Sequence, residues 1–322
     1  MDEERYPTEY PVPDIAPYRR GNTGIDYVHT FDSGRPGPHV MINALTHGNE
    51  VCGAYAVDRL FRWGTRPARG KLTLSFANVD AFSRFSVERP ADTRWVDEDF
   101  NRVWSDDKLD GPRTSSELAR ARALRPLVAA ADLLFDLHSM HLPAPPVTIA
   151  GPHAKGRELA RRLGLPAFVI SDSGHATGAR MRDYRGFGDP ASPKNALLVE
   201  CGQHGEATAA QTALDSSLAF LRESGIMAEA FFEAHPVPAR VPQRFIQVTH
   251  PVIIRSERFE FVQRYTGMET IARAGTVIGH DGGEPVTTPY DDCILVMPAP
   301  ARYVRPGFTA VRLGRVIEQS RP

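Results

Sequence analysis

Short apolar runs alternate with helix-like segments over the first two thirds of the chain, and this alternation limits the folds open to it. Runs of strand length lie at residues 25–31, 39–45, 71–77, 132–137, 146–150, 167–171 and 196–200. Segments that read as helices lie at residues 54–63, 115–131, 155–163 and 207–223. Strands that alternate with helices favour a parallel sheet with the helices packed against it. We therefore predict an α/β fold with a mixed, mostly parallel sheet and helices on both faces.

The length and spacing of the apolar runs change after residue 235. Residues 234–238 read as a proline-containing linker, and the later runs are short, β-like and broken by glycine and proline: residues 252–254, 276–278, 293–297 and 310–316. Such a pattern is typical of a small all-β domain. We predict a larger domain over residues 1–235 and a small C-terminal all-β domain over residues 236–322. We expect the second domain to shape a pocket mouth or to join copies of the chain in a homo-oligomer.

The balance of charge and hydrophobicity excludes several classes of protein. Of the 322 residues, 42% are hydrophobic and 24% charged, which is ordinary for a soluble globular protein. The formal net charge of -1 creates no field that would attract nucleic acid or an anionic membrane. No run approaches the roughly 18 apolar residues of a membrane span, and the N-terminus lacks the apolar core of a secretory signal. The three cysteines are too widely spaced to suggest a disulfide framework. We expect a cytoplasmic protein that binds neither nucleic acid nor membranes.

Polar side chains with metal-binding chemistry stand at the ends of three predicted strands. His47 and Glu50 follow the run at 39–45, His138 follows the run at 132–137, and Glu200 ends the last run. Ligands and catalytic groups gather outside the carboxyl ends of the strands in open α/β sheets. Two imidazoles and one carboxylate make a three-ligand site that leaves a fourth position open for water or substrate. The sequence thus predicts a metal site, although each residue taken singly could be an ordinary polar residue at a strand end.

Three neighbouring residues leave alternatives open at this site. Asp136 precedes His138 on the strand, and we expect its side chain on the opposite face, with support of a histidine ligand as the other interpretation. His141 is an alternative ligand to His138. Cys201, beside Glu200, could be a thiol nucleophile, but a buried strand-end cysteine is the commoner case.

An ordered set of short motifs is more specific than any one of them. Its members are His47-Gly48-Asn49-Glu50, Asn78 after the next strand, residues 94–102, Asp136-Leu137-His138 and residues 200–205. In this order the set resembles the succinylglutamate desuccinylase/aspartoacylase family, a branch of the zinc carboxypeptidase-like fold. The resemblance covers roughly residues 40–225, and the C-terminal β segment is similar to that family's second domain.

The resemblance implies a catalytic role for five residues. His47, Glu50 and His138 would bind one Zn²⁺ per chain. Glu200 would be the general base that activates water and later protonates the leaving amine, and Arg94 would stabilise the oxyanion. Each role suits the chemistry of its group, since a carboxylate can shuttle a proton and a guanidinium can neutralise developing negative charge.

The resemblance also implies residues that bind the substrate. Asn101 and Arg102 would hold a substrate carboxylate, for which the guanidinium fork is well suited. His204 would hydrogen-bond the substrate or satisfy a turn. The candidates for gripping a second carboxylate are Arg180, Arg182 and Arg185, of which we assign Arg182 to the site.

These roles predict a zinc-dependent amide hydrolase that removes the acyl group from an N-acyl amino acid or a related small amine. A carboxypeptidase-like peptidase and a metal-binding relative without catalytic activity are the alternatives. A carrier domain of the lipoyl or biotinyl type needs a lysine at an exposed turn, and the chain contains no lysine after Lys194. The sequence therefore favours an enzyme that acts on a small molecule.

Overall fold

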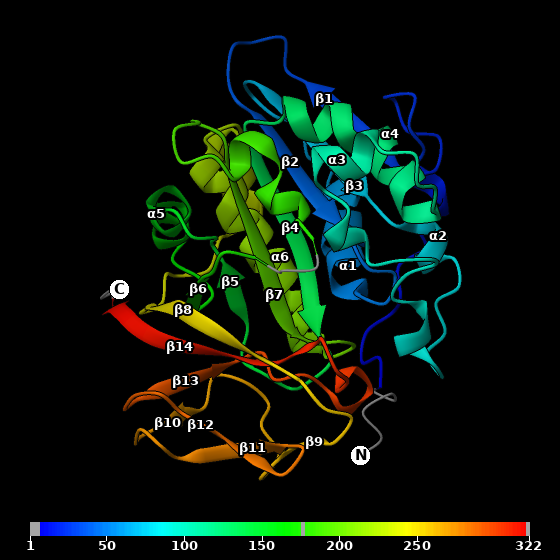
Figure 1. The fold of residues 1–322 in the computed structure, drawn as a ribbon. Helices are drawn as coiled ribbons and strands as arrows, with labels where there is room; N and C mark the ends of the chain where they lie inside the picture. Colours follow the sequence, from blue (N-terminus) through cyan, green and yellow to red (C-terminus); the bar gives the residue numbers. More distant parts are fainter. Residues whose placement is uncertain (1–6, 175–177, 320–322) are drawn as a thin grey trace.

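A computed structural model describes residues 7–174 and 178–319 (Figure 1). Its strands up to residue 203 are β1 (Val28–Asp32), β2 (His39–Ala44), β3 (Lys71–Phe76), β4 (Leu133–Met140), β5 (Val147–Ile149), β6 (Phe168–Ser171) and β7 (Asn195–Gln203). The later strands are β8 (Arg244–Ile253), β9 (Phe259–Phe261), β10 (Thr270–Ile271), β11 (Val277–Asp281), β12 (Glu284–Thr287), β13 (Cys293–Val296) and β14 (Thr309–Gln319). Eleven of the described strands form one mixed sheet in the order β1-β3-β2-β4-β7-β5-β6-β8-β14-β13-β10, and β12-β11-β9 form a second, antiparallel sheet.

Helices cover both faces of the parallel part of the large sheet. They are α1 (Val51–Arg62), α2 (Val79–Phe82), α3 (Asp106–Asp110), α4 (Ser116–Ala130), α5 (Ala154–Leu163), α6 (Ala207–Ser224) and α7 (Glu229–Ala234). Successive side chains of a strand point to opposite faces. Val40 and Ile42 of β2 therefore join the core packed by α1 and α6, whereas Met41 joins the core packed by α4. The predicted α/β class, with helices on both faces, is confirmed.

Parallel pairing brings the predicted site residues to one edge of the sheet. β2 pairs in parallel with β4, and β4 pairs in parallel with β7. In the register of β4 and β7, His138 lies directly opposite Glu200. β4 continues to Met140, so His138 lies within the strand rather than just beyond it. The helix expected at 54–63 begins earlier, at Val51, and this leaves only a short turn for His47 and Glu50.

The C-terminal residues form β structure, as predicted, but most of their strands extend the large sheet. β8 pairs in parallel with β6, and β14, β13 and β10 follow by antiparallel pairing. The separate sheet consists of β9, β11 and β12. In Figure 1, β14 and the short turn at Ala301–Tyr303 lie beyond the carboxyl ends of β4 and β7, where both parts of the chain line one cavity. The boundary at residues 235 and 236 stays a prediction.

Across the two described stretches of the chain, every helix is too short or too polar to cross a membrane.

Candidate active site

The turn between β2 and α1 presents the first two metal-ligand candidates. Leu45 adopts a positive φ of 58°, which turns the chain where β2 has ended. The backbone N–H of Glu50 donates to the carbonyl oxygen of His47 at 3.2 Å, so the turn is tight. A Cβ at Gly48 would lie 2.4 Å from the carbonyl oxygen of Thr93. Glycine at this position therefore allows the neighbouring loop to pack directly on the turn.

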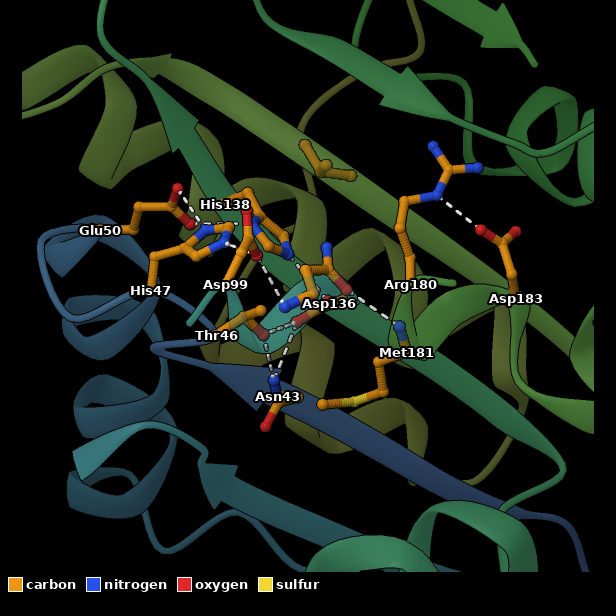
Figure 2. Close-up of polar contacts among 12 residues, drawn as sticks. Asn43, Thr46, His47, Glu50, Asp99, Asp136, His138, Arg180, Met181 and Asp183 are labelled. Atoms are coloured by element: carbon orange, nitrogen blue, oxygen red, sulfur yellow. Dashed lines mark hydrogen bonds and ion pairs between the residues drawn. The ribbon is translucent and has the colours of Figure 1, made fainter. Parts of the chain in front are cut away.

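His47, Glu50 and His138 converge in the interior of the protein (Figure 2). The Nδ1 atom of His47 lies 2.8 Å from Oε1 of Glu50, and the Nδ1 atom of His138 lies 2.8 Å from Oε2 of the same carboxylate. One candidate ligand atom from each residue lies within 4.8 Å of the other two. The structure thus brings the three predicted metal ligands together.

A further carboxylate holds the far nitrogen of each imidazole (Figure 2). Asp99 Oδ1 lies 2.9 Å from His47 Nε2, and Asp136 Oδ2 lies 2.7 Å from His138 Nε2. Contacts of this kind orient a histidine ring and leave its other nitrogen for a metal. The expectation that Asp136 points away from His138 is wrong, because residues two apart share one face of a strand. The alternative interpretation, support of a histidine ligand, agrees with this contact.

Asp136 is itself held by donors from β2 and the turn that follows it. Asn43 Nδ2 and Thr46 Oγ1 each donate to Asp136 Oδ1 at 2.8 Å. Asn43 in turn accepts a hydrogen bond from Ser75 Oγ at 2.6 Å. All four side chains are buried, and a satisfied buried network of this kind is rigid. The orientation of His138 is therefore determined by the core of the sheet.

The charge of this group of residues suits a cation. Burial alone would raise the pKa of Glu50, but His47 and His138 hold it well below its usual range. Burial would likewise raise the pKa of Asp99, and His47 is the strongest of the groups that hold it well below. Two imidazole nitrogens and one anionic oxygen are donors that Zn²⁺ accepts in a three-ligand site. The residues present fit zinc.

Glu200 borders the same site from the neighbouring strand. It lies opposite His138 in the β4–β7 register, and only 8% of its surface is exposed. Among the described residues its Oε2 has no hydrogen-bond partner. Burial, together with the charge of Glu50, raises the pKa of Glu200 to about 7. A carboxyl group with this pKa can accept and return a proton near neutral pH.

Two arginines from the loop at residues 94–102 accompany these groups. Arg94 Nη1 donates to Glu50 Oε1 at 3.1 Å. The nearest nitrogens of Arg94 and Arg102 lie 3.8 and 3.9 Å from Asp99 Oδ2. Both arginines line the cavity described next, as their predicted roles require.

These groups open into one cavity of about 560 Å³. Its charged lining near the metal-site candidate consists of Glu50, Arg94, Asp99, Arg102 and Glu200. The remainder of its wall includes residues from both ends of the C-terminal β segment: Ile253, Met297, Phe308 and Arg312. The site therefore combines the strand ends of the parallel sheet with the C-terminal strands.

Two of the predicted substrate-binding residues lie behind the cavity wall. Asn101 is 3% exposed, and its Oδ1 accepts a hydrogen bond from the backbone N–H of Met181 at 2.9 Å. His204 is 1% exposed, and its Nδ1 lies 2.7 Å from the hydroxyl oxygen of Ser139, a cavity residue. Burial lowers the pKa of His204 to about 3, so the ring is neutral. Direct substrate contact by Asn101 or His204 stays a prediction.

Arg182 is placed differently from its prediction. Its Nη2 atom donates to the carbonyl oxygens of Ala150 and Ala196 at 3.1 and 2.9 Å, and its Nη1 atom donates to Asp183. Arg182 is 2% exposed and is not among the residues that line the cavity. These contacts tie strands β5 and β7 to the adjoining loop, so the geometry gives Arg182 a packing role.

The other two candidate arginines are also engaged elsewhere. Arg180 makes a two-pronged ion pair with Asp172, at 3.0 and 2.7 Å. Arg185 pairs with Asp106 at the surface.

Arg312 of β14 also lines the cavity, and sequence reasoning missed it. It lines the cavity and is 8% exposed, and its Nη1 lies 3.9 Å from the sulfur of Met297. Burial lowers the pKa of Arg312 to about 10, against the opposing effect of Asp172. The signal in the sequence was a cation with apolar neighbours on both sides, Val311 and Leu313, in the run at 310–316.

The two alternative reactive residues take other positions. His141 lines the cavity, and its ring centre lies 5.5 Å from that of Tyr303, but it is not part of the candidate metal cluster. Cys201 is fully buried, and burial raises the pKa of its thiol well above the usual value. A buried thiol that resists ionisation is a poor nucleophile.

Fold and site together define an α/β protein with a buried His-Glu-His metal-site candidate at the ends of its parallel strands. The family model of the succinylglutamate desuccinylase/aspartoacylase catalytic domain matches residues 36–224, which is more than half of the chain. The protein belongs to this family, whose members are metal-dependent deacylases.

Solved structures named for this family share the fold. The succinylglutamate desuccinylase from Vibrio cholerae superposes with a TM-score of 0.66 at 18% identity, over 91% of this chain and 86% of its own. The enzyme of the same name from Chromobacterium violaceum gives a TM-score of 0.65 at 17% identity, over 91% and 89%. The product-bound structure of the ectoine utilization protein EutE (DoeB) from Ruegeria pomeroyi superposes with a TM-score of 0.58 at 18% identity, over 89% of this chain and 88% of its own. None of the curated proteins compared with the chain matches it significantly.

Proposed function

We propose that the protein is a zinc-dependent amide hydrolase that removes the acyl group from an N-acyl amino acid or a related small amine. The observation that carries the proposal is the place of Glu200. It is a buried carboxyl group with a pKa of about 7, set opposite His138 and bordering the same cavity as Glu50. A zinc ion held by His47, Glu50 and His138 would lower the pKa of a water molecule and polarise the amide carbonyl.

Glu200 supplies the proton transfers of the reaction. It accepts a proton from water as the oxygen attacks the amide carbon, and it passes that proton to the nitrogen of the leaving amine. The C–N bond breaks, and the products are a carboxylic acid and a free amine. Because the pKa of Glu200 lies near 7, neither proton transfer is strongly uphill at neutral pH.

Three arginines that line the cavity have two further roles. Arg94, which donates to Glu50, stands beside the metal ligands and neutralises the negative charge that develops on the carbonyl oxygen. Arg102 and Arg312, which both line the cavity, together bind one carboxylate of the substrate. The sequence had assigned Arg182 to a second carboxylate, and Arg182 does not line the cavity. A guanidinium can bind a carboxylate through two parallel hydrogen bonds, which fixes the substrate in orientation.

Product analysis on matched substrates tests the proposed reaction. Zinc-loaded protein is incubated with N-acetyl amino acids and with dipeptides of the same C-terminal residues. We expect free amino acid and acetate from the first set, and rates at least about 100-fold lower for the dipeptides. Faster cleavage of the dipeptides would identify a carboxypeptidase-like peptidase. Absence of hydrolysis with zinc bound would identify a metal-binding relative without catalytic activity.

A further inference from the structure

The cavity has two walls of unlike chemistry. The wall beside the metal-site candidate is charged and includes Glu50, Arg102 and Glu200. The wall contributed by the C-terminal strands is mainly apolar, with Ile253 and Met297 among its members. The inference drawn from this contrast rests on the proposed function and concerns the class of substrate.

The apolar wall exposes large side chains to the cavity. Ile253 is 39% exposed and Phe308 is 36% exposed, and both line the cavity. Ligand pockets are typically apolar concavities with a few polar groups that orient the ligand. Covering apolar surface contributes about 25 cal/mol per Å². Exposed side chains of this kind, inside a concave site, favour a ligand that has an apolar part of its own.

The wall is held in place by the backbone. Ile253 pairs with Thr309 in the β8–β14 register. The N–H of Ile254 donates to the carbonyl oxygen of Phe308 at 2.9 Å, and the guanidinium of Arg305 lies 4.1 Å from the centre of the Phe308 ring. Hydrogen bonds therefore hold the backbone of both residues in place, and little backbone entropy is lost when a ligand covers this wall.

The size of the cavity agrees with a substrate larger than a short dicarboxylate. Its volume of about 560 Å³ lies within the range of roughly 300–1,000 Å³ that is typical of pockets for drug-sized ligands. A short N-acyl dicarboxylic amino acid could occupy the charged wall, but it would leave Ile253 and Phe308 uncovered.

We infer that the natural substrate is an N-acyl amino acid with a carboxylate held at Arg102 and Arg312 and a large apolar group packed on Ile253, Met297 and Phe308. The apolar group is either a medium-length acyl chain or the side chain of the amino acid. In both cases the substrate contains one amide, one carboxylate and one bulky apolar group. The C-terminal β segment thus selects the substrate.

Kinetics on a matched panel tests the inference. The panel contains N-acetylaspartate, N-acetylphenylalanine and N-octanoylglutamate. We expect kcat/KM for at least one of the two apolar substrates to exceed that for N-acetylaspartate by about 10- to 100-fold. The preferred one of these two substrates shows whether the apolar group of the natural substrate lies on the amine side or on the acyl side of the amide.

Variants of the wall show whether it causes the preference. Ile253→Ala and Phe308→Ala should each lower kcat/KM for the preferred apolar substrate about tenfold, with N-acetylaspartate changed by less than about twofold. Ile317→Ala is the matched control, because Ile317 is 50% exposed on β14 and does not line the cavity. Ile317→Ala should leave kcat/KM unchanged for both substrates. A wild-type preference for N-acetylaspartate, unaffected by the wall variants, would overturn the inference and leave the proposed reaction intact.

A binding measurement separates the inference from the reaction. Calorimetry on zinc-loaded Glu200→Gln compares N-octanoylglutamate, N-acetylphenylalanine and N-acetylaspartate. We expect the preferred apolar ligand to bind about 100-fold more tightly than N-acetylaspartate, with a more negative heat-capacity change. If this holds while the wild type cleaves no amide, the inference stands and the proposed reaction fails. Equal binding of all three ligands would overturn the inference.

Discussion

The two walls of the cavity are built in different ways. The charged wall is formed by Glu200 of the parallel strand β7, by Glu50 at the start of α1 and by the loop at residues 94–102. The two imidazoles beside it are held on both sides by carboxylates. The wall from β8, β13 and β14 stands on antiparallel strands near the end of the chain and presents partly exposed apolar side chains. Substitution in the first wall disturbs a buried network, whereas substitution in the second changes only a surface that a ligand covers. We therefore expect substitutions in the two walls to separate the proposed reaction from the choice of substrate.

Removal of the base should produce the largest effect and leave the metal in place. We expect Glu200→Gln to lower kcat by about 10²- to 10⁴-fold, because the variant can no longer accept a proton. Zinc content should match the wild type, since Glu200 is not among the three candidate ligands. Equal loss of zinc and activity in this variant would mean that Glu200 is a ligand rather than the base.

Weakening the contact that holds a metal-ligand candidate should lower the affinity for zinc and leave the selectivity among substrates unchanged. We expect Asp136→Asn to lower zinc affinity about 10- to 100-fold, measured by competition with a chelator, because His138 loses an anionic partner. Once the variant is saturated with zinc, its ranking of substrates should be that of the wild type. Asp292→Asn, at an exposed turn, is the control. A changed ranking would contradict the separation of the two walls.

Arg312 is a buried cation within the mainly apolar wall, and its removal should act on binding. We expect Arg312→Met to raise KM for a carboxylate-bearing substrate about 10- to 100-fold, with a smaller change in kcat. Arg315→Met, on the same strand but exposed and outside the cavity, should change neither constant. A fall in kcat at unchanged KM would assign Arg312 to the reaction itself.

The pH dependence of activity should follow the protonation of Glu200. Its pKa is raised to about 7, so the proton-accepting form is lost as pH falls through that value. We expect kcat/KM to fall about tenfold per pH unit on the acidic limb. A bound cation favours the ionised carboxylate and moves the limb to lower pH. In Glu200→Gln the residual rate should lack this limb. An unchanged limb in the variant would assign it to another group.

The sequence predicted the charged wall far better than the apolar one, for a physical reason. His47, Glu50, His138 and Glu200 each stand at the end of an apolar run, and parallel pairing brings such ends together. Local pattern therefore sufficed for the metal-ligand set. The side-chain direction of Asp136 could also have been predicted, because residues two apart on a strand point to the same face. The prediction placed Asp136 and His138 on opposite faces instead.

The apolar wall depends on contacts between residues far apart in the sequence. Arg312 and Phe308 line the same cavity as Glu200 because β8 pairs with β6 and β14 pairs with β8. No local pattern encodes that pairing, so the sequence predicted the C-terminal β structure but not the union of most of its strands with the large sheet. The position of Arg182 depends on such contacts as well, since its partners are the carbonyl oxygens of Ala150, which follows β5, and of Ala196 on β7.

The metal content of the purified protein shows whether His47, Glu50 and His138 hold a metal ion. Elemental analysis compares the wild type with Glu200→Gln and with His138→Ala. We expect about one zinc per chain in the wild type, the same amount in Glu200→Gln, and loss of the metal in His138→Ala. A wild type that takes up no zinc even when zinc is added, or a His138→Ala variant that keeps it, would rule out a metal site at His47, Glu50 and His138.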